Sequence, residues 1–162
     1  MTLSEMQAEL NASRAAGIAQ LIYAAAEARS ISQAWATAIG SRENDLVNSI
    51  GDDGHAVGVM QIDIRSWPQA VAAKADGSWQ TSPDVLIGLG CQILAENLAW
   101  AQKTYPDYNE DQWYKIASAA YNAGQGGAAR GVASGDVDSV TTGGNYGADV
   151  LTRKALLEQL GL

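Results

Sequence analysis

Residues 41–65 read SRENDLVNSIGDDGHAVGVMQIDIR, and this stretch is the most informative part of the chain. It places three candidate catalytic carboxyl groups, those of Glu43, Asp52 and Asp63, within 21 residues. The glycines between them let the backbone turn sharply, and the short apolar run 57–62 is suited to one wall of a cleft. The stretch therefore predicts an acid and a base that face each other.

Four short motifs follow one another along the chain: Ser41–Glu43, Gly51–Gly54, Gly58–Asp63 and Ala120–Gly124. In this order and spacing they resemble the goose-type lysozymes, which are relatives of the soluble lytic transglycosylases. The resemblance extends from about Ser30 to the C-terminus. It implies a lysozyme-like fold, mainly α with a small sheet or irregular wing (α+β), in which the cleft lies between the helices and the wing.

The resemblance also implies roles for the three carboxyl groups. Glu43 matches the family's catalytic acid, and Asp52 and Asp63 match two aspartates thought to hold and activate a water molecule. The implied activity is that of a muramidase, which hydrolyses the β-1,4 bond between N-acetylmuramic acid and N-acetylglucosamine with inversion. The residues alone leave other interpretations open. Adjacent aspartates before a glycine are usually turn residues, and Asp63 is also suited to an ion pair with Arg65 or Arg42.

A second group of residues is expected to contact the substrate. Tyr121 and Asn122 fall where the family places a tyrosine and a polar residue beside the catalytic acid, and the Tyr121 hydroxyl group is suited to a hydrogen bond with Glu43 or the sugar. Without the family, a tyrosine near a helix end more often serves packing. Trp67 replaces a histidine that commonly follows the Arg-Ser pair, so a subsite is expected to differ. The expected substrate contacts are Met60, Gln61, Tyr121, Asn122, Tyr146 and, at the cleft edge, His55.

Composition limits the classes of partner and cofactor. The formal net charge is −8 and the pI is about 4.4, which argues against nucleic acid and leaves peptidoglycan glycan strands to be held by short-range contacts. His55 is the only histidine and has no cysteine nearby, so no zinc site is expected. Asp136 and Asp138 lack the spacing of a calcium loop. We therefore expect no metal and no cofactor.

Length and hydropathy predict a single domain over residues 1–162, with residues 1–29 as a helical extension that the resemblance covers weakly. No stretch approaches the roughly 20 apolar residues of a membrane span. Residues 1–10 lack the basic start and apolar run of a signal peptide. We expect a monomer that is extracellular or directed to the cell wall, by an export route that the chain does not reveal.

Helical spacing and capping residues predict the elements that carry the first motifs. Apolar residues at helical spacing predict a helix over residues 17–29. Ser30 or Ser32 is expected to cap the next helix, which ends near Glu43. A carboxyl group there meets the negative end of the helix dipole, which favours its protonated form. Residues 44–64 are expected to be irregular at first and then to form short strands.

The second half of the chain predicts three further helices. Ser82–Asp84 indicates a helix start, with a serine cap and a proline at the first position, and this helix is expected to end before the next proline. Asn109, with a glutamine three residues on, resembles a capping box for a helix that ends near Gly124. Residues 125–144 are expected to be helical only in part, and a last helix to span residues 146–160.

Two other functions fit the same motifs. A lytic transglycosylase would use the muramoyl 6-hydroxyl group as nucleophile and leave a 1,6-anhydro end. That reaction needs a single acid/base, so the presence of Asp52 and Asp63 favours hydrolysis. A non-catalytic peptidoglycan-binding or structural module would keep the cleft without the chemistry, and the intact Glu43 argues against it.

Overall fold

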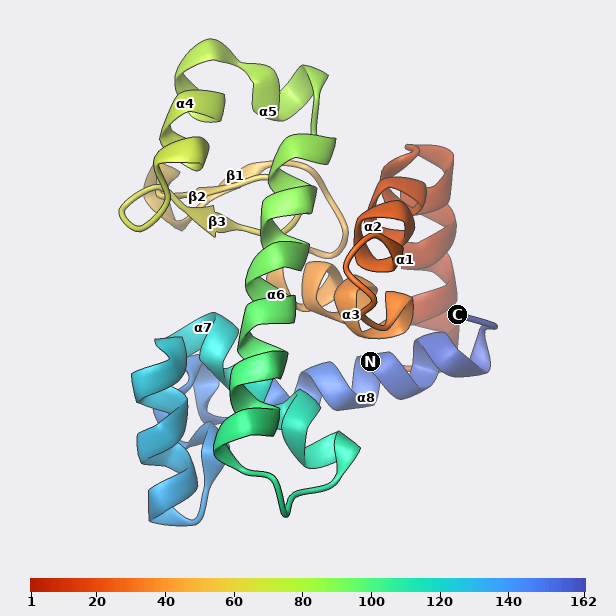
Figure 1. Cartoon of the computed structure of the whole chain (residues 1–162). Helices are drawn as coiled ribbons and strands as arrows, with labels where there is room; N and C mark the ends of the chain where they lie inside the picture. Colours follow the sequence, from red (N-terminus) through yellow and green to blue (C-terminus); the bar gives the residue numbers. More distant parts are fainter.

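Helices form most of the chain, and α6 runs through the middle of the molecule, with the small sheet and α4 on one side of it and α1 and α2 on the other (Figure 1). The computed structural model describes all residues, 1–162. The helices are α1 Leu3–Ala15, α2 Ile18–Glu27, α3 Gln33–Asn44, α4 Pro68–Asp76, α5 Ser78–Thr81, α6 Asp84–Thr104, α7 Glu110–Ser134 and α8 Tyr146–Gln159. The strands are β1 Ile50–Gly51, β2 Ala56–Val57 and β3 Ile62–Asp63, and 3-10 turns lie at η1 Asp52–Gly54, η2 Val137–Val140 and η3 Thr142–Gly144. This architecture confirms the predicted fold class.

Helix α3 is buried along most of its length and carries Glu43 near its C-terminal end. Every residue of the range Ala34–Ser41 is buried. Ser32 caps the helix, as predicted, by accepting a hydrogen bond from the backbone N–H of Trp35 at 3.1 Å. The indole N–H of Trp35 donates to Ser118 Oγ at 2.9 Å, so its one polar atom is satisfied in the core. Because the helix is held in this way, the position of Glu43 is fixed.

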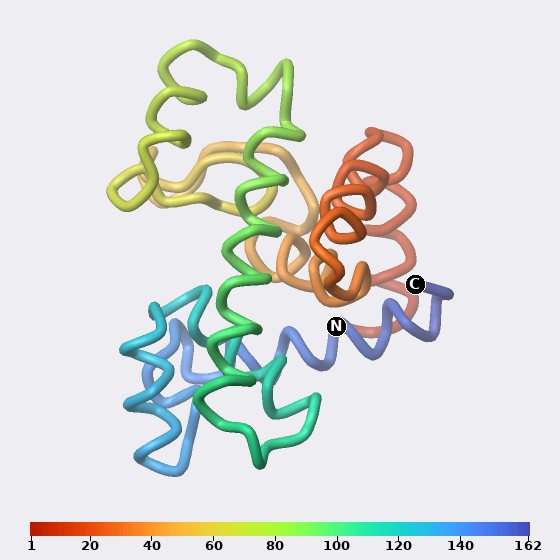
Figure 2. The backbone as a smooth tube through the Cα atoms, viewed as in Figure 1, coloured from red at the N-terminus to blue at the C-terminus, as the bar shows by residue number.

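The first two helices belong to the main hydrophobic core. Thr2 and Glu5 form a capping box at the start of α1. Met6 and Leu10 on the same helix are completely buried. Helix α1 packs on α2 and α8, and Figure 2 shows that both ends of the chain lie on this side of the molecule. The N-terminal segment therefore packs against α8, the helix that carries Tyr146, the hydrogen-bond donor to Glu43.

The sheet and the helices α4 and α5 form the wing, which we define as residues 50–81. Its three strands are antiparallel in the order β1-β2-β3. Ala56 pairs with Gly51 on one side and with Asp63 on the other, so these residues form one row across the sheet. Since Asp52 follows Gly51, the pairing brings Asp52 close to Asp63. Asp52 and Gln61 have left-handed φ angles of 47° and 45°, a conformation that costs a non-glycine residue about 1–3 kcal/mol.

Helix α7 consists of two helical segments that meet at a kink, close to the predicted end of the helix. The capping box of Asn109 and Gln112 is present, as predicted. At Gly124 the backbone leaves helical geometry (φ 72°, ψ 160°), and helical structure then resumes. A Cβ atom at Gly131 would lie 2.5 Å from the carbonyl oxygen of Val137, so close packing of η2 against α7 explains this glycine. The first helical segment thus ends at Gly124, as predicted, and residues 125–144 are helical in part, also as predicted.

The other helix boundaries show one error. Helix α6 begins at Asp84 with Pro83 at its N-cap and no side-chain hydrogen bond there, so the predicted serine cap is wrong. Its end at Thr104, before the next proline, is confirmed. Helix α8 begins at Tyr146 and ends shortly before Gly161 (φ 92°), also as predicted. No helix has both the length and the apolar character that crossing a membrane requires.

Candidate active site

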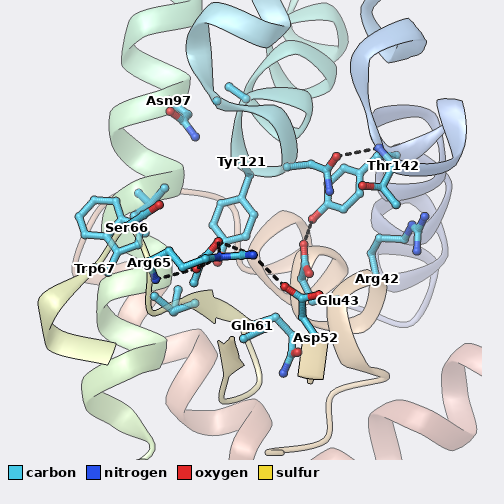
Figure 3. A pocket seen from close by; sticks show the side chains of 18 of the residues that line it. Arg42, Glu43, Asp52, Gln61, Arg65, Ser66, Trp67, Asn97, Tyr121 and Thr142 are labelled. Carbon is cyan, nitrogen blue, oxygen red and sulfur yellow. Dashed lines mark hydrogen bonds and ion pairs between the residues drawn. The ribbon is translucent and has the colours of Figure 1, made fainter. Parts of the chain in front are cut away.

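A cleft of about 840 Å³ lies where the wing faces the helices. Helix α3 contributes Glu43 to its lining, and the wing contributes Asp52, Gln61 and Asp63. Helices α6 and α7 form the opposite side (Figure 3). The lining residues among those predicted from the sequence are Glu43, Asp52, Gln61, Asp63, Tyr121, Asn122 and Tyr146. Segments that lie about 100 residues apart in the chain thus meet at one site.

Glu43 is half-buried and has one hydrogen-bond partner, the hydroxyl group of Tyr146, which donates to Oε1 (Figure 3). Burial raises the pKa of Glu43 because the charged form loses its hydration. The Tyr146 hydrogen bond and the charge of Arg42 act in the opposite direction, and burial has the larger effect. Glu43 therefore keeps its proton to a higher pH than an exposed glutamate, which is what a general acid requires.

Arg65 joins the two aspartates of the wing. Its Nη2 atom lies 2.9 Å from Asp52 Oδ2 and 2.8 Å from Asp63 Oδ2, and its Nε donates to Asp63 Oδ1 at 2.9 Å. The backbone N–H of Arg65 also donates to Asp63 Oδ1, at 2.7 Å. These hydrogen bonds hold the pKa of Asp63 below its usual range. Both oxygens of Asp63 are thus occupied, whereas Asp52 Oδ1 has no protein partner.

The two tyrosines of the cleft have different partners. Tyr146, and not Tyr121, donates to Glu43, so the hydrogen bond with Glu43 suggested for Tyr121 is not formed. The Tyr121 hydroxyl group instead donates to the carbonyl oxygen of Met60 at 2.7 Å and ties α7 to the wing. Burial, followed by the charge of Glu43, raises the pKa of each tyrosine well above its usual range. Both therefore remain neutral hydrogen-bond donors.

Two of the predicted substrate contacts do not line the cleft. The side chain of Met60 is completely buried, and a Cβ atom at Gly90 would lie 2.8 Å from its Cβ and Cγ atoms. Met60 contributes to the site only through its carbonyl oxygen. The Nδ1 atom of His55 lies 2.9 Å from the carbonyl oxygen of Asp52, so this ring folds back on its own turn. The expected contact of the Met60 side chain with substrate is therefore wrong, whereas a contact of His55 at the edge of the cleft stays a prediction.

Gln61 and Asn122 line the cleft and also stabilise its walls. The Nε2 atom of Gln61 donates to the carbonyl oxygens of Gly58 at 2.7 Å and of Ser49 at 3.2 Å. The Oδ1 atom of Asn122 accepts a hydrogen bond from the backbone N–H of Thr142 at 2.9 Å (Figure 3). These contacts fix the loops on both sides of Glu43, and they leave the remaining polar atoms of both amides for a ligand.

Sequence reasoning missed one pair of cleft residues. Asn97 on α6 is 6% exposed, and Gln125 Nε2 donates to its Oδ1 at 3.1 Å. Both residues line the cleft, on the side where Figure 3 shows Asn97 and Trp67. A signal existed, because Asn97 interrupts the apolar face of its helix one turn after Ile93. The partner, Gln125, has no such signal, since it lies in a segment rich in glycine.

Other chemistries find little support in the structure. No group of three or more histidine, cysteine, aspartate or glutamate side chains is placed to hold a metal ion. Cys91 is buried on α6, and burial raises the pKa of its thiol to about 11. A thiol of that pKa remains protonated at neutral pH and is a poor nucleophile. The carboxyl groups that line the cleft are those of Glu43, Asp52, Asp63 and Glu96.

Comparisons with known proteins agree with the site. The family model described as "Lysozyme g" matches residues 1–161, starting before the region in which the motifs occur. A lysozyme g from Takifugu rubripes is 33% identical over 93% of this chain and 78% of its own length. The lysozyme g of Gallus gallus is 33% identical over 87% of this chain and 64% of its own length, and that of Struthio camelus 33% over 72% and 52%. The chain thus spans about half to four fifths of the curated relatives.

Proposed function

Because the chain belongs to the goose-type lysozyme family, we propose that it hydrolyses the β-1,4 bond between N-acetylmuramic acid and N-acetylglucosamine in peptidoglycan. The family match confirms the predicted class of enzyme, a glycoside hydrolase of the lysozyme type. One observation carries the proposal further than the family does. Glu43 is half-buried in the wall of a cleft, with its pKa raised by burial.

In the proposed reaction, Glu43 protonates the glycosidic oxygen as the bond to the muramic acid carbon breaks. The positive charge that develops at this carbon is met by a water molecule on the opposite face of the sugar, as in other inverting glycosidases. The proton that the water loses must pass to a second carboxylate. Asp52 suits this role because its Oδ1 atom has no protein hydrogen bond.

Asp63 has a different role in this proposal. Arg65 occupies both of its carboxylate oxygens and lowers its pKa, which makes Asp63 a weak base. Asp63 instead fixes Arg65, and Arg65 in turn fixes Asp52 Oδ2. The pair Asp63–Arg65 thus orients the free oxygen of Asp52 toward the site of the water. Each carboxyl group of the cleft then has its own task.

The same ion pairs favour a second candidate reaction. Because Arg65 binds both carboxylate oxygens of Asp63 and lowers its pKa, only Asp52 of these two aspartates is left as a base for water, and its Oδ2 atom is also bound to Arg65. A lytic transglycosylase needs no such base, since Glu43 can protonate the leaving group and then accept the proton of the muramoyl 6-hydroxyl group. The product would carry a 1,6-anhydro end.

Mass spectrometry of the soluble fragments from purified peptidoglycan separates these candidates. We expect fragments with reducing muramic acid ends from the wild type and a large loss of them with Asp52→Asn. Anhydro ends, lighter by one water, with full activity in Asp52→Asn would establish the transglycosylase instead. If no fragments of either kind were released by the folded wild type, the chain would be a binding module.

We further propose that the enzyme works as a monomer, outside the cell or at the cell wall. All the cleft residues come from one chain, so no second copy is needed to complete the site. The substrate proposed here is the cell wall itself, which sets the place of action. A net charge of −8 gives no general attraction to anionic walls, so the cleft contacts must supply the affinity.

A further inference from the structure

Arg42 precedes Glu43 in the chain and lines the same cleft. Its ion pair, however, is with Asp149 and not with Glu43. Its Nε atom lies 3.2 Å from Asp149 Oδ2 on α8. Its guanidinium carbon lies 5.3 Å from the centre of the Tyr146 ring, in the position of a cation–π contact. The hydroxyl group of that same tyrosine donates to Glu43. The charged group of Arg42 is thus held by Asp149 and Tyr146, and it forms no ion pair with Glu43.

Asp149 is itself held by a second arginine. Arg153 Nε donates to the same Oδ2 atom at 2.8 Å. Arg153 Nη1 donates to Ser41 Oγ on α3 at 2.6 Å and lies 4.0 Å from Glu9 Oε2 on α1. The side chain of Arg153 is 13% exposed, and those of Asp149 and Arg42 are 27% and 28% exposed. Three helices therefore fix Asp149 in a setting where water screens charges only in part.

We propose that Asp149 is a positioning residue for the catalytic acid, because it holds the guanidinium group of Arg42 over Tyr146 and so prevents an ion pair between Arg42 and Glu43. The inference rests on the proposed role of Glu43 as general acid. Such an ion pair would favour the carboxylate form of Glu43, and a carboxylate cannot protonate the glycosidic oxygen. Asp149 acts on the reaction only through Arg42 and does not itself meet the substrate.

Other charged and titratable groups line the same cleft as Glu43. They are Tyr121 on α7, Asp52, Asp63 and Arg65 in the wing, and Glu96 on α6. None of these groups forms a hydrogen bond or ion pair with Asp149, whose partners are Arg42 and Arg153. A change at Asp149 therefore reaches Glu43 through Arg42.

The pH profile of kcat/KM on purified peptidoglycan tests this inference, because the alkaline limb reports the loss of the proton from the acid. In Asp149→Asn, Arg42 is released and its charge is no longer balanced, so the limb should move to lower pH by about 0.5–1 unit. Arg42→Gln removes the cation and should move the limb to higher pH. The double variant should behave as Arg42→Gln does, since Asp149 acts through that residue.

Glu158→Gln is the matched control. It breaks an ion pair between Lys154 and Glu158 (2.6 Å) on the same helix, α8, outside the cleft, and the alkaline limb should not move. Thermal unfolding of each variant shows that the assays are run on folded protein. If Asp149→Asn does not fold, the test is the alkaline limb of Arg42→Gln. A shift of that limb to higher pH supports the inference, and an unmoved limb overturns it.

Failure of the inference and failure of the proposed function give different results. An active wild type whose alkaline limb stays in place in Asp149→Asn, with kcat reduced equally at every pH, would make Asp149 merely structural. A shift in the same direction for Asp149→Asn and Arg42→Gln would also overturn the inference. A folded wild type without activity would remove the proposed function itself, and the inference with it.

Discussion

Tyr146→Phe removes the hydroxyl group that donates a hydrogen bond to Glu43, the proposed catalytic acid. The hydroxyl group of Tyr146 is the only donor to Glu43, and Tyr146 is 2% exposed, so little water is available to replace it. The hydrogen bond favours the ionised form of Glu43 and opposes the larger effect of burial. Its loss should therefore raise the pKa of Glu43 further above its usual range.

The size of this shift follows from the difference between a charged and a neutral acceptor. A hydrogen bond to a charged group contributes about 1.5–3 kcal/mol, and one between neutral groups about 0.5–1.5 kcal/mol. Tyr146 thus favours the carboxylate form of Glu43 over the carboxylic acid by roughly 1–1.5 kcal/mol. Since one pKa unit corresponds to about 1.36 kcal/mol, the pKa of Glu43 should rise by about 0.7–1 unit.

The assay is the pH dependence of kcat/KM with purified peptidoglycan. The alkaline limb of Tyr146→Phe should lie about one pH unit above that of the wild type. Tyr121→Phe is the control, because this buried tyrosine also lines the cleft but donates to the carbonyl oxygen of Met60. An alkaline limb that stays in place or moves to lower pH in Tyr146→Phe would refute the reasoning, as would an equal shift in Tyr121→Phe.

Three further predictions concern stability and the wing. Glu43→Gln should raise the Tm at pH 7 by about 2–4 °C and leave it unchanged at pH 4. The pKa of Glu43 is raised in the folded state, so the wild type loses stability as the pH rises above about 4.5, whereas the Glu43→Gln variant does not. Equal differences in Tm at both pH values would contradict this. Arg65→Gln should lower kcat/KM on purified peptidoglycan by about tenfold or more, because Arg65 is the only residue that holds Asp52 Oδ2; an unchanged kcat/KM would count against this role of Arg65. Gly131→Ala should destabilise the fold by about 1–3 kcal/mol in denaturant unfolding, because its Cβ would meet the Val137 carbonyl oxygen at 2.5 Å, and a neutral effect would disprove that contact.

Local signals in the sequence predicted the helix that carries Glu43, the proposed catalytic acid. The serine cap at Ser32 and the helical spacing that follows place Glu43 near the end of α3, where the structure has it. The capping box at Asn109 and the glycine after α8 were predicted for the same reason. Each of these features depends on contacts between residues a few positions apart, which a sequence displays directly.

Contacts between distant segments were not predictable in the same way. The motifs identified both Tyr121 and Tyr146, but only the packing of α8 on α3 decides that Tyr146 reaches Glu43. The glycines after Gly124 predicted a segment that is helical only in part, whereas the structure is helical up to Ser134, and the tight approach of η2 explains the glycine at position 131. Spacing alone also could not show that Arg65 holds both aspartates, because that depends on the register of the sheet.

The most direct test of Glu43 as general acid compares the release of reducing ends from purified peptidoglycan by the wild type and by Glu43→Gln. Both proteins are measured at the pH optimum of the wild type, after thermal unfolding has shown that both are folded. We predict that the variant loses activity by about 10²–10⁴-fold, the usual contribution of a positioned acid. A variant within tenfold of the wild type would contradict the assignment of Glu43.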